Sequence, residues 1–147
     1  MMSQVCVDAS FVVAMFVPER FSQAALTLWR EWTLNDWQMI APMLLRYEVT
    51  SALYRKALSG LITVADSREA LQHFLTLDIK MADPPSLSLR AVEFTEKFQR
   101  PNTYDAHYLA LAESQDCPFW TGDERLANSI GASLGNLFWL GHYPVRT

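Results

Sequence analysis

Short apolar runs alternate with helical patterns along nearly the whole of this 147-residue chain, and this alternation limits its fold more than any other feature. Five runs have the length and composition of strands, namely Gln4–Asp8, Trp37–Ala41, Leu77–Ala82, Phe119–Thr121 and Leu137–Leu140. Alternating strands and helices are typical of a parallel sheet whose two faces are covered by helices. We therefore predict an α/β fold with a parallel sheet of four to five strands flanked by helices.

The segments between these runs place apolar residues three and four positions apart, which is the spacing of a helix with one buried side. The predicted helices are Phe21–Trp32, Pro42–Leu58, a segment near 65–75, a segment from Ser86 or Ser88 to about Phe98, Asp105–Gln115 and Asp123–Ser129. Gly60 stands where the second of these needs a C-terminal cap, and Thr63 stands where the third needs an N-cap.

The bulk properties predict one domain over residues 1–147, because a chain of this length with 50% hydrophobic residues can bury a single core. The longest apolar stretch, 11–17, is too short to cross a bilayer, and the N-terminus lacks the pattern of a secretion signal. We therefore expect a cytoplasmic protein with no membrane partner. Cys6 and Cys117 have no metal-ligand spacing and are expected to be buried thiols.

Four acidic residues stand at positions that a parallel sheet would bring together. Asp8 ends the first strand-like run and Asp123 follows the fourth by two residues, so both belong to the carboxyl edge of the sheet. Ligands bind beyond this edge in open α/β sheets. Asp105 begins a predicted helix, where the helix dipole favours an acid, and Glu48 lies inside the largely apolar pattern of another helix.

Carboxylates that are gathered together repel one another unless a cation is present, and carboxylate oxygen is a preferred ligand of Mg²⁺ and Mn²⁺. Such an ion can polarise a phosphate oxygen and generate hydroxide for attack on a phosphodiester. Taken singly, Asp105 and Asp123 also fit ordinary helix-cap and turn roles. Glu48 alone also fits a solvated residue paired with Arg55 or Lys56. The presence of all four acids favours a shared site.

Four motifs around these acids resemble the PIN domain, and most of all the single-domain VapC-type toxins of toxin–antitoxin pairs. The motifs are VCVDAS around Asp8, LLRYEVTSAL around Glu48, TYDAHYLALAE around Asp105 and WTGDERLA around Asp123. Their order and spacing resemble the family over almost the full chain. The resemblance implies a metal-dependent endoribonuclease whose four acids are catalytic and hold one or two Mg²⁺ or Mn²⁺ ions.

The resemblance also implies supporting residues and partners. Ser10 and Thr121 match a hydroxyl near the site, and Asn128 matches a further polar group that some members carry. The implied partners are an RNA substrate, a protein antitoxin and a second copy in a homodimer. The apolar residues of Phe21–Trp32 exceed one buried stripe, so this helix fits either an interface with such a partner or a well-covered core position.

The charge of the chain bears on how it would hold RNA. A net charge of −4 argues against binding nucleic acid by bulk charge, although a local basic rim is compatible with it. Five basic residues near the acid motifs fit either phosphate contacts or simple solvation, namely Arg46, Arg55, Lys56, Arg100 and Arg125, and Arg125 is the best candidate for a contact. A second function class also stays open, a catalytically silent PIN-like module that binds RNA or a protein partner.

Overall fold

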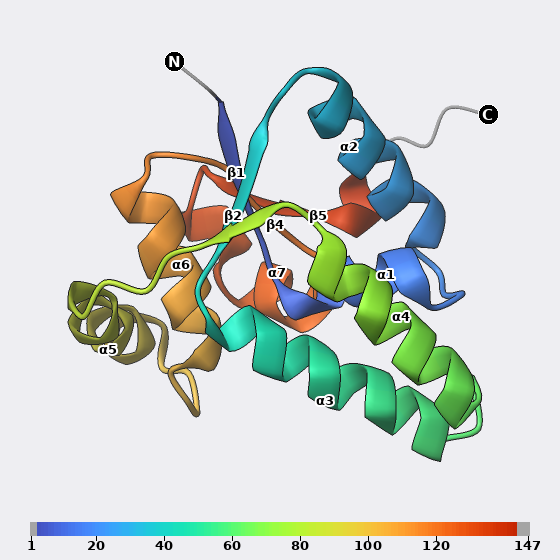
Figure 1. The fold of residues 1–147 in the computed structure, drawn as a ribbon. Helices are drawn as coiled ribbons and strands as arrows, with labels where there is room; N and C mark the ends of the chain where they lie inside the picture. Colours follow the sequence, from blue (N-terminus) through green and yellow to red (C-terminus); the bar gives the residue numbers. More distant parts are fainter. Residues whose placement is uncertain (1–2, 144–147) are drawn as a thin grey trace.

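Five parallel strands form one sheet in the order β3-β2-β1-β4-β5 in the computed structural model, which describes residues 3–143 (Figure 1). The strands are β1 (Gln4–Val7), β2 (Gln38–Ala41), β3 (Ile79–Met81), β4 (Phe119–Thr121) and β5 (Leu137–Trp139). The predicted fold class is therefore confirmed. All four pairings are parallel, so the carboxyl ends of the strands share one edge.

Seven α-helices connect and cover the strands within residues 3–143. They are α1 (Ala9–Phe16), α2 (Ser22–Leu34), α3 (Leu44–Leu58), α4 (Val64–Thr76), α5 (Ser86–Phe98), α6 (Tyr104–Ser114) and α7 (Glu124–Ile130), with two short 3₁₀ turns, η1 (Gly131–Ser133) and η2 (Leu140–His142). The predicted caps are confirmed. Gly60 follows α3 with a φ of 81°, and Thr63 forms a reciprocal capping box with Asp66 at the start of α4.

Helix α1 was not predicted from the sequence, and it shortens the first strand by one residue. Its residues 11–14 are all buried, so the segment lacks the polar side that reveals an amphipathic helix. Asp8 is not part of β1 but the N-cap of α1, because its side chain accepts a hydrogen bond of 3.0 Å from the backbone N–H of Phe11. The first acid therefore stands at a strand-to-helix junction.

The two faces of the sheet are packed by different helices, because alternate residues of a strand point to opposite faces. On one face Tyr108 of α6 stacks on Phe119 of β4, with ring centroids 5.9 Å apart. On the other face the ring of Trp120 of β4 lies against that of Trp32 of α2, with ring centroids 6.4 Å apart. The sheet is thus the middle layer of three, with helices on both sides (Figure 1).

The strand order reverses beside β1, and this reversal positions the site. After β1 the chain adds β2 and β3 on one side, and then returns to add β4 and β5 on the other. Such a switch point opens a crevice between the carboxyl ends of the two strands, here β1 and β4. Within residues 3–143, no helix combines the length and the apolar character that crossing a membrane requires.

Candidate active site

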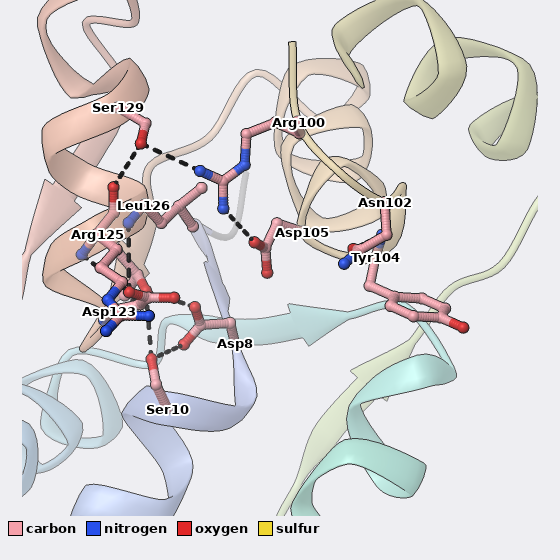
Figure 2. A network of polar contacts seen from close by, with 11 residues as sticks. Asp8, Ser10, Arg100, Asn102, Tyr104, Asp105, Asp123, Arg125, Leu126 and Ser129 are labelled. Carbon is pink, nitrogen blue, oxygen red and sulfur yellow. Dashed lines mark hydrogen bonds and ion pairs between the residues drawn. The ribbon is translucent and has the colours of Figure 1, made fainter. Parts of the chain in front are cut away.

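A cleft of about 320 Å³ opens at the carboxyl edge of the sheet, and all four predicted acids line it. Asp8 comes from the β1–α1 junction, Glu48 from α3, Asp105 from the first turn of α6 and Asp123 from the β4–α7 junction. Asp8, Glu48 and Asp105 are far apart in the sequence, and the fold brings all four acids to one cleft. Figure 2 shows three of the four acids from close by.

Asp8 is the most buried of the four acids, with 6% of its surface exposed. Ser10 donates a hydrogen bond of 2.6 Å to its Oδ1, and Thr121 donates one of 2.5 Å to its Oδ2. The pKa of Asp8 is raised to about 7, because burial and, to a smaller extent, the nearby charge of Asp105 raise it more than the hydrogen bonds lower it. Ser10 and Thr121 therefore contact the first of the four acids directly.

The β4–α7 junction is built around the same two hydroxyls. The backbone N–H of Gly122 donates to the Ser10 hydroxyl at 2.8 Å, and the N–H of Asp123 donates to the Thr121 hydroxyl at 3.0 Å. The Asp123 side chain accepts hydrogen bonds of 2.9 and 3.3 Å from two N–H groups in the first turn of α7. Asp123 is thus a helix cap that also lines the cleft.

Glu48 has a partner that the sequence analysis did not identify. The Tyr108 hydroxyl donates a hydrogen bond of 2.5 Å to Glu48 Oε1, rather than the ion pair considered with Arg55 or Lys56. Burial raises the pKa of Glu48, and the hydrogen bond from Tyr108 and the charge of Arg55 lower it in part. Burial also raises the pKa of Tyr108, so its hydroxyl keeps the proton that it donates.

Arg100 forms an ion pair with Asp105, with 2.9 Å between Nη2 and Oδ2. Its Nη1 donates a hydrogen bond of 3.1 Å to the hydroxyl of Ser129 on α7, as Figure 2 shows. The Arg100 side chain is 20% exposed and that of Asp105 is 31% exposed. A cation of the chain itself therefore lies against one of the four acids.

Two predicted residues are not brought into the cleft. Asn128 and Arg125 lie exposed on α7 and are not among the residues that line it. Arg55 and Lys56 of α3 do line it, and Lys56 forms an ion pair of 3.3 Å with Glu19. Of the five basic residues named from the sequence, two on α3 thus line the cleft, whereas Arg125, the preferred candidate, does not.

Sequence reasoning missed Tyr108 and Glu19, which both line the cleft. Tyr108 carries a usable signal, because it follows Asp105 by three positions and so lies on the same side of α6. Glu19 stands between α1 and α2, in a connection whose course no periodic pattern reveals. The apolar side of α2 is used largely within the chain, since Trp32 stacks on Phe11 with centroids 5.3 Å apart.

The donor set of the cleft suits a hard divalent cation. Four carboxylates supply the oxygen ligands that Mg²⁺ and Mn²⁺ prefer, and the charge of Asp105 raises the pKa of both Asp8 and Glu48, which is repulsion that a cation would relieve. Among residues 3–143, however, no three acidic, histidine or cysteine side chains form a group already arranged to hold an ion. Direct coordination of one ion by three of these carboxylates would therefore require their side chains to move closer together, whereas coordination through water would not.

This chain has relatives that carry ribonuclease names. It is 36% identical to Ribonuclease VapC1 of Mycobacterium tuberculosis over 132 residues, and this match covers 88% of this chain and 93% of that protein. It is 34% identical to VapC ribonuclease Mb0985 of Mycobacterium bovis over 88 residues, and this match covers 60% of this chain and 67% of that protein.

Two solved structures share the fold, each with a TM-score of 0.65. PAE2754 from Pyrobaculum aerophilum has 24% sequence identity and covers 88% of this chain and 87% of its own. VapC20 of Mycobacterium tuberculosis, described as a toxin that cleaves the sarcin–ricin loop, has 16% identity and covers 85% and 94%. The family model of the PIN domain matches residues 5–129, a range that contains all four acids of the cleft. The chain belongs to the PIN domain family.

Proposed function

We propose that this PIN domain is an endoribonuclease that depends on Mg²⁺ or Mn²⁺ and acts as the toxin of a toxin–antitoxin pair. One observation carries the proposal, namely the convergence of four carboxylates from four elements on one cleft at the switch point of the sheet. The ribonuclease name of the VapC1 relative, which is similar over most of the chain, supports RNA as the substrate.

Asp8, Glu48, Asp105 and Asp123 would hold the metal. When bound, the ion supplies a Lewis acid that polarises the phosphodiester and lowers the pKa of an attacking water. The carboxylates would bind the ion and orient it, and the hydroxyl and N–H groups around the carboxylates set their orientation. Because Asp8 is fixed through both of its oxygens, it is the most rigid of the four acids.

The rim of the cleft supports binding of a phosphate backbone. Arg55 and Lys56 of α3 line the cleft together with the four carboxylates, and Lys56 is paired with Glu19. Cationic side chains near phosphates fix the position of a nucleic acid without reading its sequence. Arg125 and Asn128, exposed on α7, would contact only those parts of an RNA that extend beyond the cleft.

The remaining parts of the proposal concern partners and place. A ribonuclease toxin needs an inhibitor, so we infer a protein antitoxin, and we infer a homodimer in the cytoplasm, where its RNA substrates lie. Light scattering coupled to gel filtration measures the size of the assembly, and a monomeric mass at micromolar concentration would exclude a stable dimer.

Cleavage of labelled single-stranded RNA tests the central activity. The parent chain is expected to cleave RNA with Mg²⁺ or Mn²⁺ and to stop when EDTA is added, and it should leave a DNA of the same sequence intact. Asp8→Asn and Asp105→Asn are each expected to abolish cleavage, while circular dichroism shows that they still fold. Full activity in either variant, or activity that EDTA does not reduce, contradicts the proposal.

Two observations favour the second candidate, a module that binds without catalysis. The carboxylates of residues 3–143 are not preassembled around an ion, and Arg100 already pairs with Asp105. Thermal unfolding with increasing Mn²⁺ separates the two functions, because a ligand that binds the folded state raises the melting temperature with its concentration. The silent module predicts the same melting temperature at every Mn²⁺ concentration.

A further inference from the structure

Arg100 is not among the residues that line the acidic cleft, but it pairs with one of the acids that do, and the family resemblance and the proposed function leave this contact unexplained. Among residues 3–143, four ion-paired contacts are found, and the contact of Arg100 with Asp105 is the one that engages any of the four proposed metal ligands. Figure 2 shows Asp105 between Arg100 and Asp8. The guanidinium therefore lies where a cation bound to Asp105 would feel its charge.

The backbone of Arg100 is fixed, so this contact is not a chance position of a surface side chain. Gln99 adopts a left-handed conformation with a φ of 51° and ends α5. The N–H of Arg100 then donates to the carbonyl of Thr95 at 3.1 Å, which is the hydrogen bond of a Schellman ending. The guanidinium is fixed as well, because Nη1 donates to Ser129 and Nη2 donates to Asp105.

We propose that Arg100 is a positioning residue that acts as an internal counter-ion of the cleft and competes with divalent cations for Asp105. It covers Oδ2 of Asp105 and offsets part of the repulsion among the acids. It therefore stabilises the metal-free fold and raises the cation concentration at which the site assembles. This inference rests on the proposed function, because it takes the four acids as the cation ligands.

Two effects weaken cation binding while Arg100 is present. A ligand oxygen that accepts from a guanidinium has to release it before it can coordinate an ion. The guanidinium charge also repels a divalent ion a few ångströms away, in a partly buried place where water screens charges less than in bulk. Removing the charge should therefore increase affinity for the cation, whereas removing a residue that only orients Asp105 should decrease it.

Isothermal titration of Mn²⁺ into the RNA-free protein tests the proposal through Arg100→Gln. We expect the variant to bind Mn²⁺ about threefold to tenfold more tightly than the parent. In EDTA its melting temperature should lie below that of the parent, and Mn²⁺ should raise it by more. Arg100→Lys keeps a positive charge on a different head group, so its affinity should lie closer to that of the parent.

Arg90→Gln is the matched control, because it removes the same charge and breaks a different ion pair between α5 and α6. Arg90 Nε lies 2.7 Å from Glu113 on α6, at the far end of that helix from Asp105. Its Mn²⁺ affinity should equal that of the parent. Equal or weaker Mn²⁺ binding by Arg100→Gln, with the parent binding normally, overturns this inference alone. A parent chain that binds no Mn²⁺ overturns the proposed function and this inference with it.

Discussion

Asp8 and Thr121 are joined by a hydrogen bond of 2.5 Å, although 113 positions separate them in the chain. Parallel pairing of β1 with β4 brings them together, because Val7 is in register with Trp120 and each residue comes next after its strand partner. The same hydroxyl accepts a hydrogen bond from the N–H of Asp123. One side-chain oxygen thus ties two of the four acids to the switch point of the sheet.

Replacing Thr121 by Val should destabilise the protein by about 1–3 kcal/mol, because the buried Asp8 carboxylate loses a hydrogen bond in a change that preserves shape. Urea unfolding at pH 8 in EDTA measures this. Thr121→Ser keeps the hydroxyl and should retain more of the stability than the Val variant. If Ser, which loses only the methyl group, destabilises as much as Val, the methyl group contributes as much to stability as the hydroxyl, and unchanged stability of Thr121→Val contradicts the prediction.

The stability of the metal-free protein should fall as the pH rises from about 4 to 7. The pKa of Asp8 is about 7 in the folded state, against 3.8 for an ordinary aspartate. In this window the folded chain binds more protons than the unfolded chain, so ionisation favours unfolding. The full stabilisation is present below the lower value and is lost above the higher one. A shift of this size corresponds to at most about 4 kcal/mol.

Asp8→Asn isolates this contribution, since an amide stays neutral and resembles the protonated acid. At pH 8 in EDTA the variant should be more stable than the parent by a few kcal/mol at most, whereas near pH 4 the two should be alike. Urea midpoints at both pH values give the comparison. Parallel pH profiles for parent and variant would show that Asp8 titrates normally. A site residue whose loss stabilises the fold is expected where charges are gathered for function.

The strand edge at which Asp8 and Asp123 meet could be predicted because it depends on topology alone. Once the strands are parallel, residues that follow them share an edge, whatever the order of the strands. Helices with one apolar side, such as α4 and α5, could be predicted for a similarly local reason. The carboxylates thus converge as expected, with Glu48 reaching them from α3.

The contacts that shape the site could not be predicted, because they depend on distances between elements. The bond from Tyr108 to Glu48 joins residues 60 positions apart, and no spacing within one helix reveals it. Arg100 was one of several basic residues near the motifs, and it pairs with Asp105 because of the way in which α5 ends. Helix α1 was not predicted for a local reason, because burial of its consecutive residues removes the alternation of apolar and polar sides that marks a helix.

Tyr108→Phe should move the acid limb of metal-dependent cleavage to higher pH. The hydroxyl of Tyr108 lowers the pKa of Glu48, so its removal lets Glu48 hold a proton to higher pH and compete with the cation. The ring should stay stacked on Phe119, which separates this effect from packing. Cleavage rates from pH 5 to 9 measure it. The exposed Tyr54 of α3 provides the control variant Tyr54→Phe, and equal profiles for both variants would contradict a role for the Glu48 contact.

Gly122→Ala should disturb the site through Ser10, because a Cβ at this position would lie 3.2 Å from the Ser10 hydroxyl and 3.3 Å from its backbone carbonyl. A backbone group cannot move aside as a flexible side chain can, so we expect a loss of about 1–3 kcal/mol. Ser10 should also shift from Asp8, which it contacts at 2.6 Å, and Mn²⁺ should bind more weakly.

Gly135→Ala is the control for this change, since a Cβ there meets no atom within 4 Å. Its stability should stay within about 0.5 kcal/mol of the parent. Urea unfolding and Mn²⁺ titration of both variants make the comparison. Among residues 3–143, the carboxylates do not already form a group of three arranged to hold an ion. The position of Ser10, which accepts from the N–H of Gly122, should therefore help to set the position of Asp8 when an ion binds. Unchanged Mn²⁺ affinity in Gly122→Ala would show that Asp8 holds its position without the Ser10 contact.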